Sequence, residues 1–268
     1  LTSMCRFPGK NLFVWLLLLP MAMPAYIVAY TYTGMFDFAG PVQTMIRDLT
    51  GWNFREYYFP QIRSMGGAIT MLSLVLYPYV YLLGRSTFLE QSVGVMEVSR
   101  TLDCGPWTVF YKVALPLARP AIVAGLSLAL METLADYGTV SFFGLGVFTT
   151  GIFRTWYGLG DYNSAAKMAS LLLFFVFLLI MMERISRKKA KYHNVSGKLS
   201  SFSEYNLYGF KAWGAFAACS IPVFLGFFLP AAQLLFWAFE TWSDMVNDSF
   251  LELVRNSFLL GLGAALIS

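Results

Sequence analysis

The sequence predicts an all-α protein that crosses a membrane several times. Its 268 residues are 57% hydrophobic and only 13% charged, and the mean hydropathy is +0.60. A soluble domain usually carries about 25% charged residues. Several segments also reach the roughly 20 apolar residues that a helix needs to cross a bilayer. Together these observations exclude an ordinary soluble domain and predict a polytopic transmembrane helical bundle.

Six apolar segments are expected to enter the membrane as helices. The first, second and fifth contain prolines, which predict kinks because proline removes a backbone donor and crowds the preceding turn, and Pro116 and Pro120 mark the entry to the third. Neighbouring helices can cover such breaks in a bilayer. The last segment has roughly 13 residues, fewer than the 17 or more that a span requires, so we expect about five full spans and one truncated span. The segments are residues 11–32, 64–83, 117–134, 165–182, 212–239 and 256–268.

The connecting segments carry unequal positive charge, which predicts an orientation. With residue 1 in the cytoplasm, 13 of the 19 Lys and Arg residues fall on the cytoplasmic side, and seven of these lie in the connector 183–211. The opposite orientation reverses that ratio, although cytoplasmic loops are usually the ones rich in Lys and Arg. Residue 1 and the loop 84–117 are therefore predicted to be cytoplasmic.

One polar stretch, residues 97–116, separates the second and third predicted spans. Its Gly105-Pro106 pair favours the start of a helix, because proline is preset for the first helical position. Three aromatic residues then follow at spacings that place them on one helical face. We expect a helix, a turn and a helix that present an amphipathic ledge to the cytosol. A simple connector, or a helix packed on the inner leaflet, would fit the same pattern. The aromatic residues are Trp107, Phe110 and Tyr111.

The same stretch resembles the EAA loop of ABC importer permeases. That loop reads Glu-Ala-Ala, three residues, Gly, nine residues and Ile-x-Leu-Pro. In this sequence Glu97, Val98 and Ser99 stand at the Glu-Ala-Ala places, and Leu115-Pro116 end the motif in register. Asp103 stands where the family has glycine, a departure that puts the strength of coupling in doubt. The resemblance implies a coupling loop that includes Glu97, Val98, Ser99, Asp103, Gly105, Pro106, Leu115 and Pro116.

Motifs outside the loop extend the resemblance to most of the chain. They are similar to ferric-iron importer permeases, which are long chains with two homologous halves and a MetI-like fold in the bacterial inner membrane. The chain starts at Leu1 and stops within an apolar run, so we expect a piece of such a protein. Residues 1–190 would be the later four spans of the first half. Residues 191–211 would be a basic cytoplasmic linker, and residues 212–268 the start of the second half. The motifs are Leu19-Pro20, residues 77–83 and residues 131–140.

The resemblance also implies a transport mechanism. The loop would bind a cytoplasmic ATP-binding subunit, and a periplasmic substrate-binding protein would deliver ferric iron. Neither Gly9-Lys10 nor Gly197-Lys198 lies in a Gly-x4-Gly-Lys-Ser/Thr P-loop. We therefore expect a transport subunit and not an enzyme, with ATP hydrolysis in a separate subunit. No nucleic-acid partner is implied.

Three alternative functions are open at this level. An importer permease for another small solute, such as thiamine, would carry the same loop. An integral membrane enzyme would cluster polar residues at one membrane face, whereas the one histidine here, His193, lies in the basic connector. A channel would need no coupling loop. The transported solute is therefore the least constrained feature.

Glu132 and Asp136 are the candidate residues of a translocation path. They are four residues apart, hence on one helical face, near the outer end of the third span. Ionisable groups at membrane depth usually face a cavity and are functional. Two carboxylates there would stabilise a cationic substrate. The alternative is a structural pair that completes hydrogen bonds between helices or lies at the interface.

No metal site or cofactor is expected. Cys5, Cys104 and Cys219 are far apart in the sequence, and neither Cys-x-x-Cys nor a His-rich pattern accompanies them. The tyrosines of the second span are expected to pack against neighbouring helices and not to ligate iron. They are Tyr77, Tyr79 and Tyr81.

Overall fold

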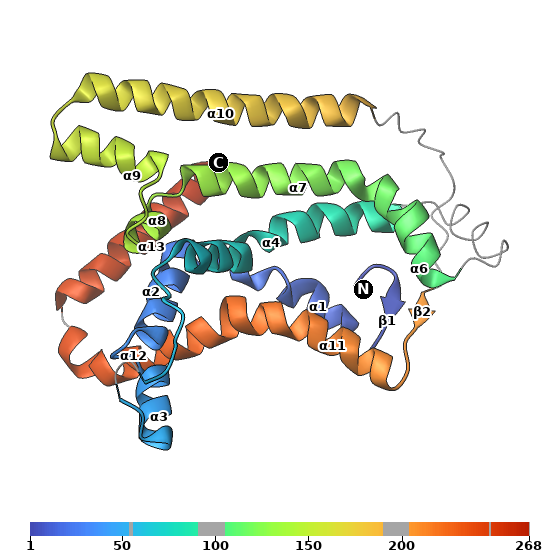
Figure 1. Ribbon diagram of the computed structural model, residues 1–268, viewed down its shortest axis with the longest axis horizontal. Helices are drawn as coiled ribbons and strands as arrows, with labels where there is room; N and C mark the ends of the chain where they lie inside the picture. Colours follow the sequence, from blue (N-terminus) through green and yellow to red (C-terminus); the bar gives the residue numbers. More distant parts are fainter. Residues whose placement is uncertain (54–55, 91–104, 190–203, 247, 268) are drawn as a thin grey trace.

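The computed structural model describes residues 1–53, 56–90, 105–189, 204–246 and 248–267. Long helices dominate these ranges (Figure 1), which confirms the prediction of an all-α polytopic bundle. Five helical stretches are long and apolar enough to cross a membrane, and a bent pair makes up to six. The five are Met65–Glu90, Trp107–Ala135, Tyr162–Ile185, Phe210–Trp242 and Ser249–Leu266.

The first predicted span is broken and does not form a single kinked helix. The chain forms α1 (Lys10–Leu16) and a 3-10 turn, η1 (Leu19–Ala22), and then turns by 87°. It continues as α2 (Ala25–Phe36) and α3 (Pro41–Thr50). Pro24, in an extended conformation, precedes α2. The kink predicted in the span over residues 11–32 is therefore a break at the prolines, and the two bent parts together are long and apolar enough for one span.

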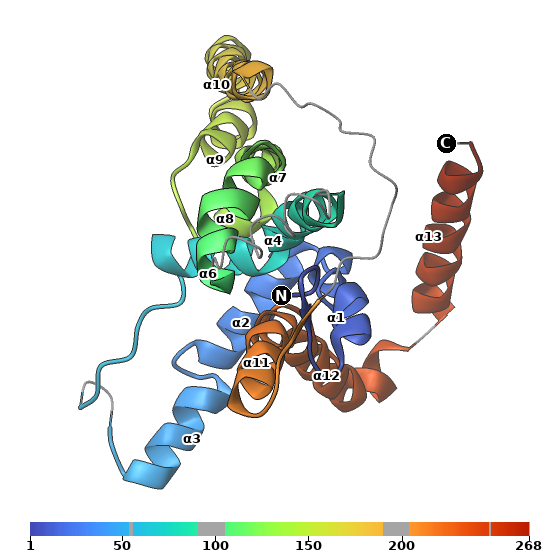
Figure 2. The same cartoon turned by 90° about the vertical axis from the view of Figure 1, so that its right-hand side faces the viewer.

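The last predicted span is longer than expected. Helix α13 (Asp248–Ile267) begins before residue 256 and includes Glu252 and Arg255, which the sequence analysis left in a loop. Its spanning stretch has 18 residues, so the predicted start of this span at residue 256 is too late. Figure 2 shows α13 standing apart from the other helices.

Two of the long helices contain a π-helical segment at corresponding positions. Helix α6 (Pro106–Val109) continues through η2 (Phe110–Ala114) into α7 (Leu115–Ala135). Helix α11 (Phe210–Val223) continues in the same way through η4 (Phe224–Phe228) into α12 (Leu229–Met245). A proline, Pro116 or Pro230, follows two residues after each segment. Proline cannot bond the carbonyl four residues earlier and collides with it, so the wider turn accommodates the proline without ending the helix.

Small residues bring the central helices close together. Helix α4 (Met65–Glu90) packs along α7, and a Cβ atom added at Gly125 would lie 2.6 Å from the Val80 Cα atom. A Cβ atom at Gly226 would lie 2.8 Å from the Leu74 carbonyl oxygen, so η4 also contacts α4 closely. Glycine at such contacts is a common feature of helix packing in membranes.

Helix α10 (Tyr162–Lys189) forms one outer edge of the bundle (Figure 1). It packs on α7 and on α9 (Phe148–Phe153), but only 6% of its spanning window is buried. A helix that is apolar on all sides and so exposed suits contact with lipid or with further membrane helices.

A two-stranded parallel sheet joins distant parts of the sequence. Strand β1 (Cys5–Arg6) pairs with β2 (Tyr205–Asn206) in the register Cys5 to Tyr205 and Arg6 to Asn206. The end of the predicted linker is thus part of an ordered contact. The N-terminus, β1, β2 and α6 lie at one end of the bundle (Figure 1), as the predicted orientation requires.

Candidate docking helix and outer carboxylate pair

Helix α6 starts where the sequence predicts. Pro106 is its first residue, and the Val109 amide donates a hydrogen bond of 3.1 Å to the Gly105 carbonyl. Prolines 116 and 120 do not separate this helix from the third span, because η2 carries it into α7. A single helical stretch of 29 residues, Trp107–Ala135, therefore leads from the polar loop into the membrane.

The start of this stretch has one anchored face and one free face. Val109 and Ala114 are 1% and 0% exposed and pack against Met4 and Phe88. On the other side Trp107 is 73% exposed. Because buried contacts fix the helix, its exposed face is held in a defined direction.

Two aromatic side chains make up the exposed face, here called the aromatic ledge (Trp107 and Tyr111). Their rings stack with centroids 6.0 Å apart, and Tyr111 is 59% exposed. Phe110 contacts both rings edge-on but is half-buried and stacks on Phe88, with centroids 6.1 Å apart. The three aromatic side chains thus lie together, as predicted, and two of them are exposed. Exposed aromatic side chains of this kind are typical of protein interfaces.

The remaining residues of the predicted coupling loop divide into two groups. Gly105 has open space around it and no left-handed backbone, so the start of α6 does not require glycine there. Leu115 is half-buried and Pro116 is exposed, both in the first turn of α7. Four others lie outside the described residues, and their placement stays a prediction. They are Glu97, Val98, Ser99 and Asp103.

Asp136, at the other end of the same helix, holds the start of the next one. Its carboxylate accepts hydrogen bonds from the Thr139 hydroxyl at 3.0 Å and from the Val140 amide at 3.2 Å. Its carbonyl accepts one from the Thr149 hydroxyl at 2.8 Å. These bonds connect the end of α7 to α8 (Gly138–Phe142) and to α9. Asp136 therefore has the structural role in hydrogen bonds between helices that the sequence analysis left open, and it caps the start of α8.

Glu132 and Asp136 nevertheless line one cavity. Its volume is about 260 Å³, and its other walls come from η1, α2 and α4, with Tyr26, Leu76 and Tyr79 among the lining residues. Glu132 is exposed and Asp136 is half-buried. At about 30 Å³ for each water molecule, the space holds a small hydrated ion or roughly eight waters. The predicted pair thus forms the acidic part of an otherwise largely apolar cavity.

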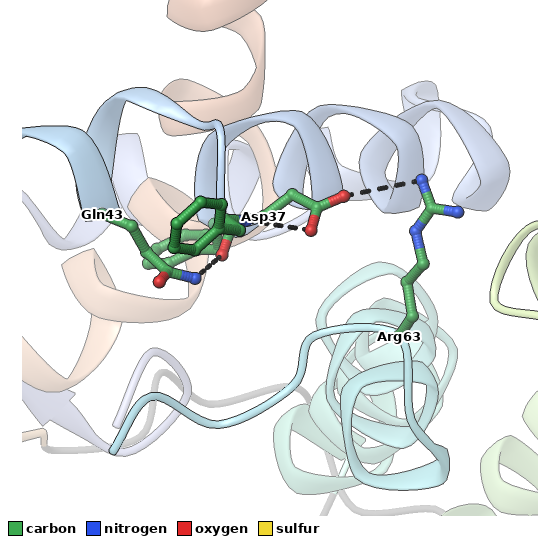
Figure 3. Close-up of polar contacts among 5 residues, drawn as sticks. Asp37, Gln43 and Arg63 are labelled. Atoms are coloured by element: carbon green, nitrogen blue, oxygen red, sulfur yellow. Dashed lines mark hydrogen bonds and ion pairs between the residues drawn. The ribbon is translucent and has the colours of Figure 1, made fainter. Parts of the chain in front are cut away.

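The sequence analysis missed a second cavity on the side of α3. It has a volume of about 810 Å³, and polar contacts organise its lining. Figure 3 shows Asp37 facing Arg63, with 3.7 Å between carboxylate and guanidinium, and Gln43 donating to the Phe36 carbonyl at 2.8 Å. The Tyr57 hydroxyl donates to the Gln43 side chain at 2.7 Å. The sequence did contain a signal for this cavity, because Asp37 and Arg63, which have opposite charges, lie at the two ends of the segment 37–63.

The tyrosines of α4 pack as the sequence analysis expects. Tyr77 and Tyr81 adjoin the apolar cluster that contains Ala215 and Cys219 of α11. The Tyr81 hydroxyl donates to the Val14 carbonyl at 3.3 Å. Within the described ranges, no group of three His, Cys, Asp or Glu residues could hold a metal ion.

Comparison with known proteins relates these features to a family. Residues 4–191 match the family described as "Binding-protein-dependent transport system inner membrane component". The Fe(3+)-transport system permease protein FbpB 2 of Haemophilus influenzae is 27% identical over 97% of this chain and 48% of its own length. The molybdenum transport system permease protein ModB of Escherichia coli is 30% identical over 52% of this chain and 58% of its own.

A third relative widens the range of solutes. The sulfate transport system permease protein CysT of Escherichia coli is 27% identical over 51% of this chain and 47% of its own. The chain spans about half the length of the curated relatives it matches.

Proposed function

The chain belongs to the family of binding-protein-dependent transport system inner membrane components, and from this we propose that it forms part of the permease of an ATP-driven importer. It is a multi-pass inner-membrane protein, in agreement with its spanning helices. We assign ATP hydrolysis to a separate cytoplasmic subunit and substrate delivery to a periplasmic binding protein.

One observation carries this proposal most directly. The helical stretch Trp107–Ala135 has the aromatic ledge at one end and the carboxylate-lined cavity at the other. At 1.5 Å per residue its 29 residues extend about 43 Å, enough to cross the membrane. A shift of the ledge is therefore a shift of one wall of the cavity, since the wall and the ledge belong to the same helix.

We propose that the aromatic ledge docks on the ATPase subunit together with the predicted loop residues. These are Glu97, Val98, Ser99, Asp103, Gly105, Pro106, Leu115 and Pro116. Closure of the ATPase would displace α6, and α7 would then move against α4, where Gly125 allows close contact. Such sliding of packed helices is a common form of conformational change. In the importer it would alternate access to the cavity.

Ferric iron is the substrate we propose. One ferric relative matches 97% of the chain, whereas the molybdenum relatives match between 51% and 70% of it and the sulfate relative 51%. The cavity adds a physical reason, because Glu132 and Asp136 would attract a cation and repel an oxyanion such as molybdate or sulfate. The oxyanions remain the second candidates because their permeases are relatives of this chain.

Residues 212–268 are proposed to begin a second permease half. They lie beyond the family match, which ends at residue 191, and the ferric relative is about twice as long as this chain. Helices α11 and α12 pack across the first half, where the Tyr32 hydroxyl donates to the Leu225 carbonyl at 2.6 Å.

Reconstituted transport tests the assignment. The full-length permease, its ATPase and its binding protein are placed in liposomes, and uptake of ferric iron, molybdate and sulfate is measured with and without ATP. We expect ATP-dependent uptake of iron alone. Uptake of an oxyanion would replace the proposed substrate, and ATP-independent flux would overturn the importer assignment in favour of a channel.

A further inference from the structure

The first ten residues of the chain contact two segments that are distant in the sequence. One is the start of the stretch Trp107–Ala135, about 100 residues away, and the other is strand β2, 200 residues away. Strand β1 pairs with β2, and the register is fixed by hydrogen bonds from the Tyr205 amide to the Met4 carbonyl at 2.9 Å and from the Leu207 amide to the Arg6 carbonyl at 3.0 Å. Two strands this short are marginal by themselves. Other contacts must therefore stabilise the pairing.

An ion pair and a buried aromatic residue supply these contacts. The Lys10 ammonium pairs with the Glu204 carboxylate, and their side chains are 14% and 34% exposed. Phe7 is 5% exposed and belongs to an apolar cluster with Phe13, Ala212 and other residues of α11. A partly buried pair is screened less than a surface pair. The segment is thus fixed to the beginning of α11.

The same segment also contacts the docking helix. Met4 packs on Val109 and Ala114, the two buried residues that anchor α6 and η2. Thr2 is 5% exposed. Only Cys5 to Gly9 separate the Met4 contact from the ion pair at Lys10, so the two contacts are joined by a short ordered piece of chain.

We propose that residues 2–10 form a strut that transmits displacement of α6 to α11, the first helix of the second half. The inference rests on the proposed function, since it assigns the ATPase to α6. It adds a second route for the same displacement. One route runs along α7 within the first half, and the strut carries the movement across to the second half through Met4, the β1–β2 pair and the Lys10–Glu204 pair.

A disulfide tests whether the two strands stay paired. Cys5 is a free cysteine, and Tyr205→Cys places a second one at its register partner. Neighbouring strands are about 4.8 Å apart, within the Cα separation of disulfides. Cys104→Ser and Cys219→Ala, with any cysteine outside these 268 residues also replaced, remove the other thiols. A protease site inserted between residues 191 and 203 of the full-length chain separates the two halves.

We expect mild oxidation to keep the cleaved fragments together on a non-reducing gel for Tyr205→Cys. The control Tyr208→Cys, beyond the strand and 77% exposed, should not cross-link. A strut also predicts that the oxidised Tyr205→Cys chain still transports. A chain that fails to cross-link, or that is blocked until the disulfide is reduced, would overturn the proposal.

Exchange of the charges of Lys10 and Glu204 tests whether the strut transmits movement from α6 to α11. In the reconstituted full-length importer, Lys10→Glu and Glu204→Lys should each lower uptake per ATP hydrolysed by roughly threefold or more, because they separate the second half from α6. The double exchange restores the pair and should restore the ratio. Lys211→Glu, at an exposed position of α11, is the control.

Met4→Ala tests the other end of the strut and should lower the ratio while Leu12→Ala, at a 61% exposed position, leaves it unchanged. Normal ratios in Lys10→Glu, Glu204→Lys and Met4→Ala would overturn the strut and leave the importer assignment intact. Absence of ATP-dependent uptake in the unmodified chain would instead overturn the proposed function, while the cross-link would still form.

Discussion

The two ends of the helical stretch Trp107–Ala135 are built in opposite ways. At the predicted cytoplasmic end, apolar contacts at Val109 and Ala114 fix the helix and leave the aromatic ledge exposed. At the outer end, hydrogen bonds to Asp136 fix the chain and leave a carboxylate-lined cavity. One end therefore suits a protein partner and the other a small polar solute. At each end the residues that stabilise the fold lie beside the residues proposed to bind a partner or a solute. Substitutions can therefore test stability and function separately.

The largest effect is expected at Gly125, in the part of α7 that lies between the two ends. In Gly125→Leu the new side chain would collide with α4, because even a Cβ atom would lie 2.6 Å from the Val80 Cα atom. Overpacking of this kind typically costs about 1–3 kcal/mol or more. Thermal unfolding in detergent should show a marked loss of stability, and uptake should be lost with it. Gly105→Leu is the matched control for stability alone, since none of the described residues lies within 4 Å of a Cβ atom there. Equal unfolding temperatures for the two variants would contradict the close packing of α4 and α7.

Substitutions at the docking end should change ATPase binding and the stability of the fold independently of each other. We expect Trp107→Ala to weaken association with the ATPase by about 2 kcal/mol, roughly 30-fold, as removal of an interface aromatic often does. Its unfolding temperature should stay unchanged because Trp107 is 73% exposed. Val109→Ala should do the reverse, with about 1–2 kcal/mol lost from stability. Affinity and unfolding measured on both variants check the contrast. Loss of stability without loss of binding in Trp107→Ala would show that the ledge is a packing surface.

Substitutions at the outer end should change iron uptake and the stability that Asp136 provides independently of each other. Glu132→Gln is expected to lower iron uptake several-fold with little change in stability, because the Glu132 side chain is exposed. Asp136→Asn keeps one oxygen that can accept from the Val140 amide but removes the charge that strengthens this bond, so stability should fall by about 1 kcal/mol. Uptake and unfolding are measured for both variants and for the double variant. Unchanged iron uptake in the double variant would leave the pair with a structural role alone.

The sequence predicted those features that depend on local patterns. Apolar length located the spans from Met65 to Trp242, and Gly105-Pro106 located the start of α6. The π segments η2 and η4 also had a local signal, the proline two residues after each, whereas no proline follows the third, η3 (Arg154–Gly158). By contrast, the prolines at 20 and 24 are compatible with a kink or with the 87° bend found, and packing against neighbouring helices decides between them.

Long-range contacts account for what the sequence could not predict. Strand β1 and its partner are each two residues long, too short to show a period of two, and they lie 200 positions apart in the chain. The spacing of Glu132 and Asp136 placed both on one face, but it could not reveal that Thr139 and Val140 would bond to Asp136. Carboxylates that cap and carboxylates that bind a solute look alike until the following helix is placed.

A second aspartate at the outer end provides the smallest and most specific test of capping. Asp161 is exposed just before α10, and its carboxylate accepts a hydrogen bond from the Ser164 amide at 3.0 Å. Hydrogen bonds from Ser164 lower the pKa of Asp161 below its usual value. Because the folded pKa is the lower one, the stabilisation is complete above the unfolded pKa of about 3.9 and is lost as the pH falls through the folded pKa.

Asp161→Asn should therefore lower the unfolding temperature slightly at neutral pH and flatten its dependence on pH below about 4. Since the group is exposed, solvent screens it and the change should be smaller than that of Asp136→Asn. Ser164→Ala removes the hydroxyl but keeps the amide donor, so it should have an intermediate effect. Unfolding curves recorded from neutral to acidic pH compare the three variants. An equal acid dependence in Asp161→Asn and the unmodified chain would show that this cap contributes nothing, and would leave Asp136 as the aspartate cap that fixes the outer end.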